Sequence, residues 1–501
     1  MANPLFATKS IPQLLKDAGI GGDSEGLTLK RTLNATNLVA LGIGAIIGAG
    51  LFSLTGLAAA NNAGPAVTLS FVVGAIGCAF AGLCYAEFAS MIPVAGSAYT
   101  YSYATMGQFI AWIIGWDLVL EYAVGAATVS ISWSQYLVKL LATYNIYLPA
   151  QLTCSPWEMA KQADGSMVSG IFNLPAVFIV VAISLLLVKG TKESAFVNAL
   201  IVILKVSVVL IFIALGWAFI NPENHTPYIP ENTGEFGHFG ISGIFRGAAV
   251  VFFAFIGFDA VSTAAQEAKN PQRDMPIGIL GSLFICTILY VLFSHVMTGI
   301  AHYTEFKGSA APVAIAIAKT PYSWLGQAII IAILAGYSSV ILVMLLGQSR
   351  VFFSMSRDRL LPKVFSEVHP QFRTPYKSNL LFMVFVSLFA AFVPVQVVGE
   401  MTSIGTLFAF VLVCIGVMVM RKTQPDAPRA FKTPFVPFVP ILGIVTCLSM
   451  MFSLPEDTWL RLIVWLVIGL AIYFFYGLKN SQVQEPVAEQ SRVATPTNPA
   501  A

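Results

Sequence analysis

Long apolar stretches separated by short polar segments run along most of this 501-residue chain. A helix needs about 18 to 25 mainly apolar residues to cross the hydrocarbon core of a bilayer. By this measure the pattern predicts twelve spans, at residues 36 to 60, 66 to 92, 107 to 142, 169 to 188, 194 to 219, 243 to 267, 276 to 302, 322 to 352, 376 to 396, 400 to 420, 433 to 454 and 458 to 478. We therefore expect an all-α integral membrane protein with twelve transmembrane helices.

The composition agrees with this class, because 57% of the residues are hydrophobic and only 10% are charged. Loops on the cytoplasmic side of a membrane carry an excess of Lys and Arg. With both termini in the cytoplasm, 20 of the 27 basic residues fall in cytoplasmic segments, six lie near the outer side and Lys205 lies within a span. The net charge of +3 then acts as an insertion signal, and no nucleic-acid partner is indicated.

Three regions follow from this pattern. Residues 1 to 33 are expected to form a cytoplasmic segment, which lacks the apolar core of a cleavable signal, so the first span must direct insertion. Residues 34 to 480 hold the twelve helices in the lipid bilayer, and residues 481 to 501, rich in Gln, Pro, Ala and Thr, are expected to be a disordered cytoplasmic tail. The six cysteines show no spacing typical of a disulfide framework or a metal site.

Two of the spans are interrupted near their centres. The stretch LGIGAIIGAGLF places four glycines in the first span, and FFAFIGFDA interrupts the sixth. Paired interruptions in the leading helices of two halves indicate an inverted-repeat transporter with its site at the membrane midplane. Unwinding at Gly48-Ala49-Gly50 would leave N–H groups for a carboxylate, and unwinding from Phe253 to Gly257 would leave carbonyls for an ammonium group. Together, the N–H groups and the carbonyls would bind the carboxylate and the ammonium group of an amino acid.

The first glycine cluster also allows a helix-packing interpretation. Gly44 and Gly48 have the four-residue spacing of a helix packing face. Taken alone, this packing interpretation would be favoured, but the matching break in the sixth span reverses the preference. A dinucleotide-binding fingerprint is excluded, because the glycine spacing is wrong and no strand precedes it.

Lys205 lies about ten residues from either end of the fifth predicted span. Its stem is too short to bring the ammonium group easily to the membrane surface from there. An ionisable residue at that depth is costly and usually functional. We expect it to bind and release a proton or to replace a bound cation, and the alternative is a structural salt bridge.

Four carboxylic residues also fall in apolar surroundings. Asp117 and Glu121 are four residues apart and share one helix face, where they could bind a proton, face a substrate side chain or be hydrated at a cavity mouth. Asp259 follows the second break, and we expect it to cap the half-helix that begins there. Glu87 lies near an inner helix end and is expected to be structural. No metal spacing and no nucleophile with a base is visible, so an enzyme is not expected.

The chain also carries four motifs of a known family: GIGAIIGAGLF, YAEFASMIPVAGSAYTYSY, FFAFIGFDAVSTAAQEAKNPQRDMPIGI and SRDRLLPKVF. Between about Leu29 and Lys479 it resembles the amino acid, polyamine and organocation transporters, and among them the bacterial members of the cationic amino acid transporter group. The resemblance implies the LeuT-type fold, in which five plus five inverted spans are followed by two extra helices. The repeats would cover about 36 to 219 and 243 to 420, and the extra helices about 433 to 478.

The resemblance implies roles for single positions around the two breaks. The backbone at the first break would bind the substrate carboxylate, and carbonyls at the second would bind the amino group. The Phe253 ring would act as a gate, and Lys205 would couple transport to protons at the place where sodium-driven relatives hold a sodium ion. The backbone positions concerned are Ile46, Gly48, Ala49, Gly50, Phe253, Ala254 and Ile256.

Two further positions, Glu121 and Met344, would lie near the substrate side chain. Many relatives carry Gly-Thr-Gly at the first break, where this chain has Gly-Ala-Gly and so lacks one hydroxyl group. Met344 is apolar where eukaryotic cationic transporters carry a polar residue, which argues against lysine and arginine as substrates, although Glu121 could pair with a cationic side chain. We therefore expect a broad range of L-amino acids, with small neutral ones such as alanine preferred.

The resulting hypothesis is a proton-coupled amino acid symporter of the plasma membrane, with the proton as coupling ion and no other cofactor. An exchanger of cationic amino acids or polyamines remains an alternative within transport. A non-transporting amino acid sensor is the alternative from another class, although the chain has no soluble signalling domain. The sequence gives no indication of an oligomeric state.

Overall fold

The computed structural model describes residues 4–17, 33–94, 96–162, 165–190, 195–309 and 311–481. These residues are helical throughout, apart from loops and one short hairpin in which β1 (Met159–Lys161) pairs antiparallel with β2 (Met167–Ser169). The tail expected beyond Ser481 lies outside the described residues, as do residues 18–32 of the expected N-terminal segment. The protein is therefore all-helical in its architecture, as the sequence predicts.

Helices occur in every predicted span. In chain order the helical elements are η1 (Pro4–Phe6), α1 (Ile11–Asp17), α2 (Ala35–Ile46), η2 (Gly50–Leu54), α3 (Thr55–Ala58), η3 (Ala59–Ala63), η4 (Gly64–Ala66), α4 (Val67–Met91), α5 (Ser97–Thr105), α6 (Gln108–Val119), η5 (Leu120–Val124), α7 (Gly125–Thr143), η6 (Ala150–Leu152), α8 (Leu174–Lys189), α9 (Ala195–Gly216), η7 (Trp217–Phe219), η8 (Pro222–His225), α10 (Gly240–Val251), η9 (Phe252–Phe255), α11 (Ala260–Thr263), η10 (Ala265–Glu267), α12 (Pro271–Ile300), η11 (Tyr303–Phe306), α13 (Pro312–Ala318), α14 (Ser323–Arg357), η12 (Lys363–Phe365), α15 (Tyr376–Phe392), α16 (Val395–Thr423), α17 (Phe438–Ser453), α18 (Glu456–Ile472), η13 (Tyr473–Gly477) and α19 (Leu478–Asn480).

Within the described residues, eight helical stretches are long and apolar enough to cross a membrane. Four more apolar helices are shorter, namely α2, α8, α15 and α17. The start of α8 differs from the prediction, because Asn173 accepts a hydrogen bond from the Ala176 N–H and Pro175 occupies the first turn, while residues 167 to 169 belong to β2. The chain is a multi-pass membrane protein.

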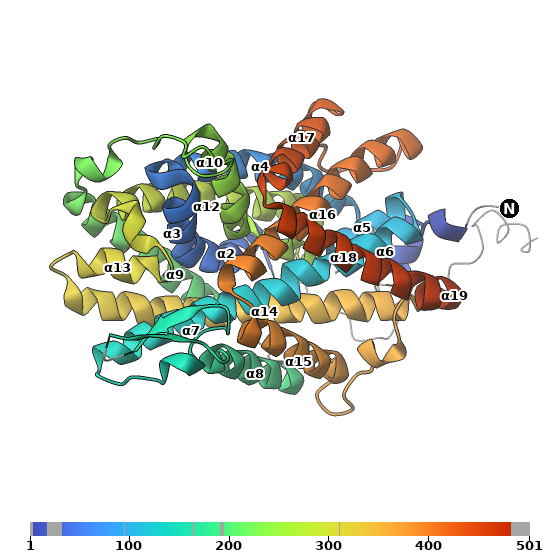
Figure 1. Cartoon of the computed structure of the whole chain (residues 1–501). Helices are drawn as coiled ribbons and strands as arrows, with labels where there is room; N and C mark the ends of the chain where they lie inside the picture. The colour runs from blue at the N-terminus through green and yellow to red at the C-terminus, as the bar shows by residue number, and fades with distance from the viewer. Residues whose placement is uncertain are drawn as a thin grey trace, which may run out of the picture.

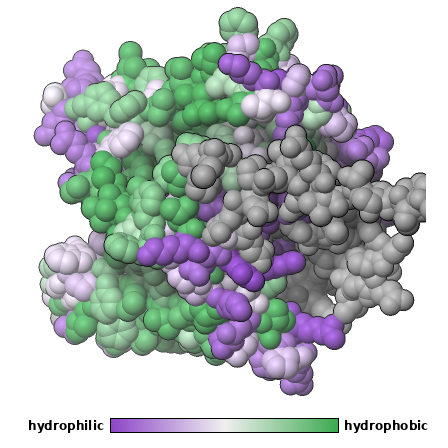
Figure 2. Space-filling view, turned by 90° about the vertical axis from the view of Figure 1, so that its right-hand side faces the viewer, coloured by the Kyte–Doolittle hydropathy of each residue, from purple (hydrophilic) through white to green (hydrophobic). Residues whose placement is uncertain are grey.

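The long helices run side by side along a common direction (Figure 1). α12 packs against α2 and α4, α14 packs against α7, and α8 lies beside α15. In α18, the Gly469 carbonyl accepts a hydrogen bond from the Trp112 indole N–H at 3.0 Å, which joins this helix to α6. Hydrophobic and hydrophilic side chains alternate in patches on the end of the molecule that bears the N-terminus (Figure 2).

The two ends of the described chain meet at Gln108, the first residue of α6. Its backbone N–H donates to the Ala7 carbonyl at 3.0 Å, and its side-chain oxygen accepts from the Ser481 hydroxyl at 2.5 Å. Lys9 adds an ion pair of 2.5 Å with Asp358, which follows α14. The start and the end of the helical domain therefore lie on the same side of the molecule.

The order of elements repeats in two halves. Each half begins with a broken helix, followed by a long helix, α4 or α12, and then a short helix, α5 or α13. A very long helical stretch comes next, residues 108–143 in the first half and α14 in the second, and a shorter helix, α8 or α15, follows. The two broken helices therefore occupy equivalent places in the order of elements.

Candidate substrate-binding site

The first break lies slightly earlier than the glycine pattern predicts. α2 ends at Ile46, Ile47 is extended with φ −71° and ψ 104°, and helical structure resumes with Ala49 as the residue that precedes η2. The expected unwinding at Gly48-Ala49-Gly50 is therefore wrong in extent, since the chain is open at Ile47 and Gly48 and is already helical at Gly50. The first N–H groups of the resumed helix have no intrahelical partner.

The second break occupies the predicted segment but keeps a helical turn. α10 ends at Val251 and continues as the 3₁₀ turn η9, after which Ile256 is extended. Gly257 has φ +118°, a backbone conformation that strains every residue with a side chain, so glycine is required there. The Phe253 carbonyl, a predicted ligand of the substrate amino group, already accepts a hydrogen bond from the Ile256 N–H at 3.2 Å.

The two breaks contact each other directly. A Cβ atom on Gly50 would lie 2.2 Å from the Ala254 Cα atom, so only glycine allows this approach of the two backbones. The Tyr290 hydroxyl from α12 lies 2.9 Å from the Ile46 carbonyl oxygen and 2.8 Å from the Ala254 carbonyl oxygen. A single buried hydroxyl group thus bridges both unwound segments. Tyr290 was not a predicted site residue, because a tyrosine within an apolar span carries no local signal of its partners.

Lys205 of α9 contacts α2 two residues before the Ile46 carbonyl of this bridge. Its side chain is 1% exposed and donates to the Gly44 carbonyl at 2.6 Å, two residues before α2 ends. The aliphatic stem packs against Gly336 of α14, where an added Cβ atom would lie 3.0 Å from Cε of Lys205. No acidic partner of Lys205 occurs in the part of the chain that the structure describes. The salt-bridge alternative therefore does not apply.

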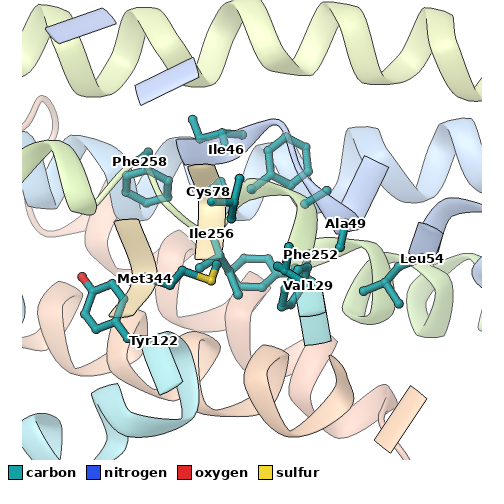
Figure 3. Close-up of a cluster of buried hydrophobic side chains, with 14 of the residues drawn as sticks. Ile46, Ala49, Leu54, Cys78, Tyr122, Val129, Phe252, Ile256, Phe258 and Met344 are labelled. Atoms are coloured by element: carbon teal, nitrogen blue, oxygen red, sulfur yellow. The ribbon is translucent and has the colours of Figure 1, made fainter. Parts of the chain in front are cut away.

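Apolar side chains flank the breaks where the substrate side chain is expected. Met344 of α14 points toward Ile256, and Tyr122 lies beyond it (Figure 3). A Cβ atom on Gly125 would lie 3.3 Å from the Met344 sulfur and 3.4 Å from Cγ2 of Thr402. Three helices, α7, α14 and α16, therefore meet at one small residue beside Met344.

Three buried carboxyl groups lie close in sequence to this apolar region. Asp117, Glu121 and Asp259 are each at most 1% exposed. The Tyr122 hydroxyl donates to Asp259, and the Ser97 hydroxyl donates to the same oxygen at 3.5 Å. Asp259 precedes α11 as expected, but its side chain makes no capping hydrogen bond. The prediction that Asp259 caps the half-helix is therefore wrong, because its carboxyl group accepts a hydrogen bond from Tyr122 instead.

Two tyrosines hold the resumed part of the first broken helix. Tyr136 of α7 donates to the Phe52 carbonyl at 2.6 Å, and the Tyr337 hydroxyl of α14 lies 2.9 Å from the Ser53 hydroxyl. Glu87, in contrast, lies near the end of α4 and pairs with Arg421 at 2.8 Å and Arg429 at 3.2 Å. This ion-pair cluster agrees with a structural role for Glu87.

Residues 33–477 match the family model described as amino acid permease. The chain belongs to the amino acid permease family. Over 485 residues, which cover 97% of this chain and 100% of the relative, the permease is 47% identical to the branched-chain amino acid permease BcaP of Bacillus subtilis. It is also 41% identical to the methylthioribose transporter of Bacillus subtilis, over 92% of this chain and 96% of the relative.

A more distant relative comes from plants. The permease is 37% identical to the vacuolar cationic amino acid transporter 2 of Arabidopsis thaliana, over 81% of this chain and 62% of that protein. The expected membership in the amino acid, polyamine and organocation transporters is confirmed, and so is the expectation of a transport protein rather than an enzyme. The roles of the single site residues stay predictions.

Proposed function

We propose that the permease is a proton-coupled symporter of neutral L-amino acids. The observation that carries this proposal is the pair of touching breaks, bridged by Tyr290, with Lys205 bonded to the backbone of one of them. Backbone N–H groups at the start of η2 would hold the substrate carboxylate. Carbonyls at Ala254 and Ile256 would accept from the ammonium group, and the Tyr290 hydroxyl, bonded to the Ala254 and Ile46 carbonyls, would hold the two segments in place for it.

The repeated order of elements supports a LeuT-type arrangement for this symporter, with five plus five spans and two further helices. The meeting of both chain ends at Gln108 agrees with an even number of spans. Because basic residues concentrate in the segments that share this side, we place both termini in the cytoplasm. The bacterial permeases among the relatives support the plasma membrane as its location.

Lys205 would carry the coupling proton. A protonated side chain donates a charge-assisted hydrogen bond to the Gly44 carbonyl, and this bond weakens when the proton leaves. Since Gly44 lies two residues before the end of α2, the bond would hold the first break in its substrate-binding shape. Proton binding and substrate binding would then favour the same conformation.

The substrate class is neutral rather than cationic. Met344 and Ile256 present apolar surfaces to the expected position of the side chain (Figure 3), and one relative is named a branched-chain amino acid permease. We therefore extend the expected small neutral substrates to valine, leucine and isoleucine.

Uptake into liposomes tests the proposal. Purified permease is reconstituted, and radiolabelled alanine and leucine are offered at about pH 6 outside and about pH 8 inside. Accumulation above equilibrium that a protonophore abolishes would support symport, whereas counterflow without net accumulation would indicate an exchanger. Competition by each unlabelled amino acid and by methylthioribose reports the substrate class, and inhibition by arginine alone would overturn the neutral assignment.

A further inference from the structure

The connection between α7 and α8, residues 144–173, is a folded loop built around the β1–β2 hairpin. It lies at the ends of these helices that point away from the N-terminus (Figure 1). The Gln135 side-chain N–H of α7 donates to the Thr153 carbonyl at 3.2 Å, and the Ser134 hydroxyl donates to the Asn173 side-chain oxygen at 2.6 Å. The Asn173 N–H donates to the Ala391 carbonyl of α15 at 3.0 Å. The connection is therefore held by α7 and α15, neither of which carries one of the two breaks.

The hairpin turns its larger apolar side chains away from the protein. The strand register places Ala160 opposite Val168, and Met159 and Met167 lie on the other face of the hairpin. Both methionines are exposed, whereas Ala160 and Val168 are half-buried. A sheet that faces water on one side usually turns its apolar residues toward the protein. The face that bears Met159 and Met167 therefore fits an apolar surrounding better than water.

Exposed apolar residues continue along the rest of the connection. Trp157, two residues before Met159, is 81% exposed. The exposed large apolar residues of the connection are Tyr144, Ile146, Tyr147, Leu148, Trp157, Met159, Met167 and Ile171. A large group of exposed apolar residues marks an interaction site, and Trp and Tyr are the side chains that concentrate where a bilayer meets water. The composition of this surface thus favours lipid as its partner.

The charged residues of the connection agree with this surrounding. Within residues 144–173 the charged residues are Glu158, Lys161 and Asp164. The Glu158 carboxylate accepts from the Ser155 N–H at 3.2 Å and from the Ser155 hydroxyl at 2.7 Å, so it is bonded inside its own loop. The loop before α10 differs, because its glutamates are exposed, and the Glu235 side chain is 79% exposed. That loop has the character expected in water.

The exposed surface of the connection leads into the lipid-facing surface of α8. Ile171 is followed by Leu174 and Phe178, which are exposed on an apolar helix of a membrane protein and therefore contact lipid. We propose that the connection lies in the headgroup and upper acyl-chain region of the leaflet away from the chain termini, with Trp157 and Met159 inserted there. It would anchor α7 and α15 to that leaflet. This inference depends on the membrane class of the protein and not on its proposed substrate or coupling.

A fluorescent label on Met159→Cys tests the anchor. All six native cysteines are buried, so the unsubstituted permease serves as the labelling blank. The label is the environment-sensitive fluorophore NBD, and the protein is reconstituted in phosphatidylcholine vesicles with or without bromine on the acyl chains. We expect a loss of emission in the brominated vesicles and little loss with aqueous iodide. Glu235→Cys is the matched control, whose emission should lie at longer wavelength and respond to iodide but not to bromine.

The two quenchers decide between the possible surroundings of the hairpin. Iodide quenching of Met159→Cys as strong as that of Glu235→Cys would overturn the inference. Protection from both quenchers would also overturn it, because protein, such as a second copy of the chain, would then cover this face. Should Met159→Cys fail to fold, Trp157→Phe gives an independent result without a label. Trp157 is one of eight tryptophans, so its loss should lower the share of tryptophan emission that brominated lipid quenches, and an unchanged share would contradict the anchor.

Discussion

The Lys205 ammonium nitrogen lies 2.6 Å from the Gly44 carbonyl oxygen. This contact joins the fifth span to the last turn of α2, just before the first break. We predict that Lys205→Ala reduces proton-driven accumulation of alanine by at least about tenfold, because the charge-assisted bond that shapes the break is lost. Uptake into liposomes with an inward proton gradient measures the effect.

A suitable control for Lys205 is Lys319, which pairs with Glu305 at 2.6 Å but is 41% exposed. Exposed ion pairs contribute about 1 kcal/mol or less to folding. Lys319→Ala should therefore keep the accumulation of wild type. Undiminished accumulation in Lys205→Ala would exclude the coupling role of this lysine.

Gly50→Ala should block transport because it disturbs the packing between the two breaks. The added methyl group would lie 2.2 Å from the Ala254 Cα atom, closer than any real contact, so one backbone segment must move. Overpacking of this kind costs about 1–3 kcal/mol, and we expect both a lower melting temperature in detergent and loss of alanine binding. Scintillation proximity binding and a thermal melt would measure the two effects.

Gly82→Ala is the comparison for this substitution. Gly82 lies inside α4, and its added methyl group would meet nothing closer than 3.5 Å. Alanine has a higher helix propensity than glycine by about 1 kcal/mol, so this variant should melt at the same temperature or above. Equal melting and binding in both variants would show that the close approach at Gly50 has no functional importance.

Tyr290→Phe should weaken substrate binding without unfolding the permease. The substitution removes the hydroxyl group that bridges the Ile46 and Ala254 carbonyls and leaves both oxygens without this partner. A buried polar group that loses its partner costs about 1–3 kcal/mol, so we expect alanine affinity to fall by about tenfold. Tyr144→Phe, at an exposed tyrosine bonded to Gln327, should leave the affinity unchanged.

Much of the fold could be predicted from the sequence, because a membrane restricts a chain to a few solutions. The apolar runs located a helix in every predicted range, and the glycine pattern located both breaks within a few residues. The start of α8 was missed because a short hairpin and an Asn173 cap replace the first apolar residues. The glycine pattern did not show where the helix resumes, and Gly50 is already helical where it approaches Ala254.

The partners of the polar side chains could not be predicted in the same way. Asp259 stood at a position typical of a helix cap, yet its carboxyl group accepts from Tyr122, 137 residues away in sequence. Tyr290 likewise joins two segments that only the folded chain brings together. Hydrogen bonds between distant spans leave no spacing or periodicity in a single sequence. Such residues therefore become visible only once the helices are placed.

Gly125→Val should change the preference of the permease among neutral substrates. The valine methyl groups would press on the Met344 sulfur, 3.3 Å from the Cβ position, and on Cγ2 of Thr402 at 3.4 Å. Met344 has a flexible thioether side chain and can move, and we expect it to move into the space that we assign to the substrate side chain. We expect leucine uptake to fall by about tenfold relative to alanine uptake, since one or two methylene groups of pocket space are worth about 1–3 kcal/mol. The ratio of the two uptake rates within the same proteoliposomes corrects for the amount of active protein, and an unchanged ratio would place the substrate side chain away from Met344.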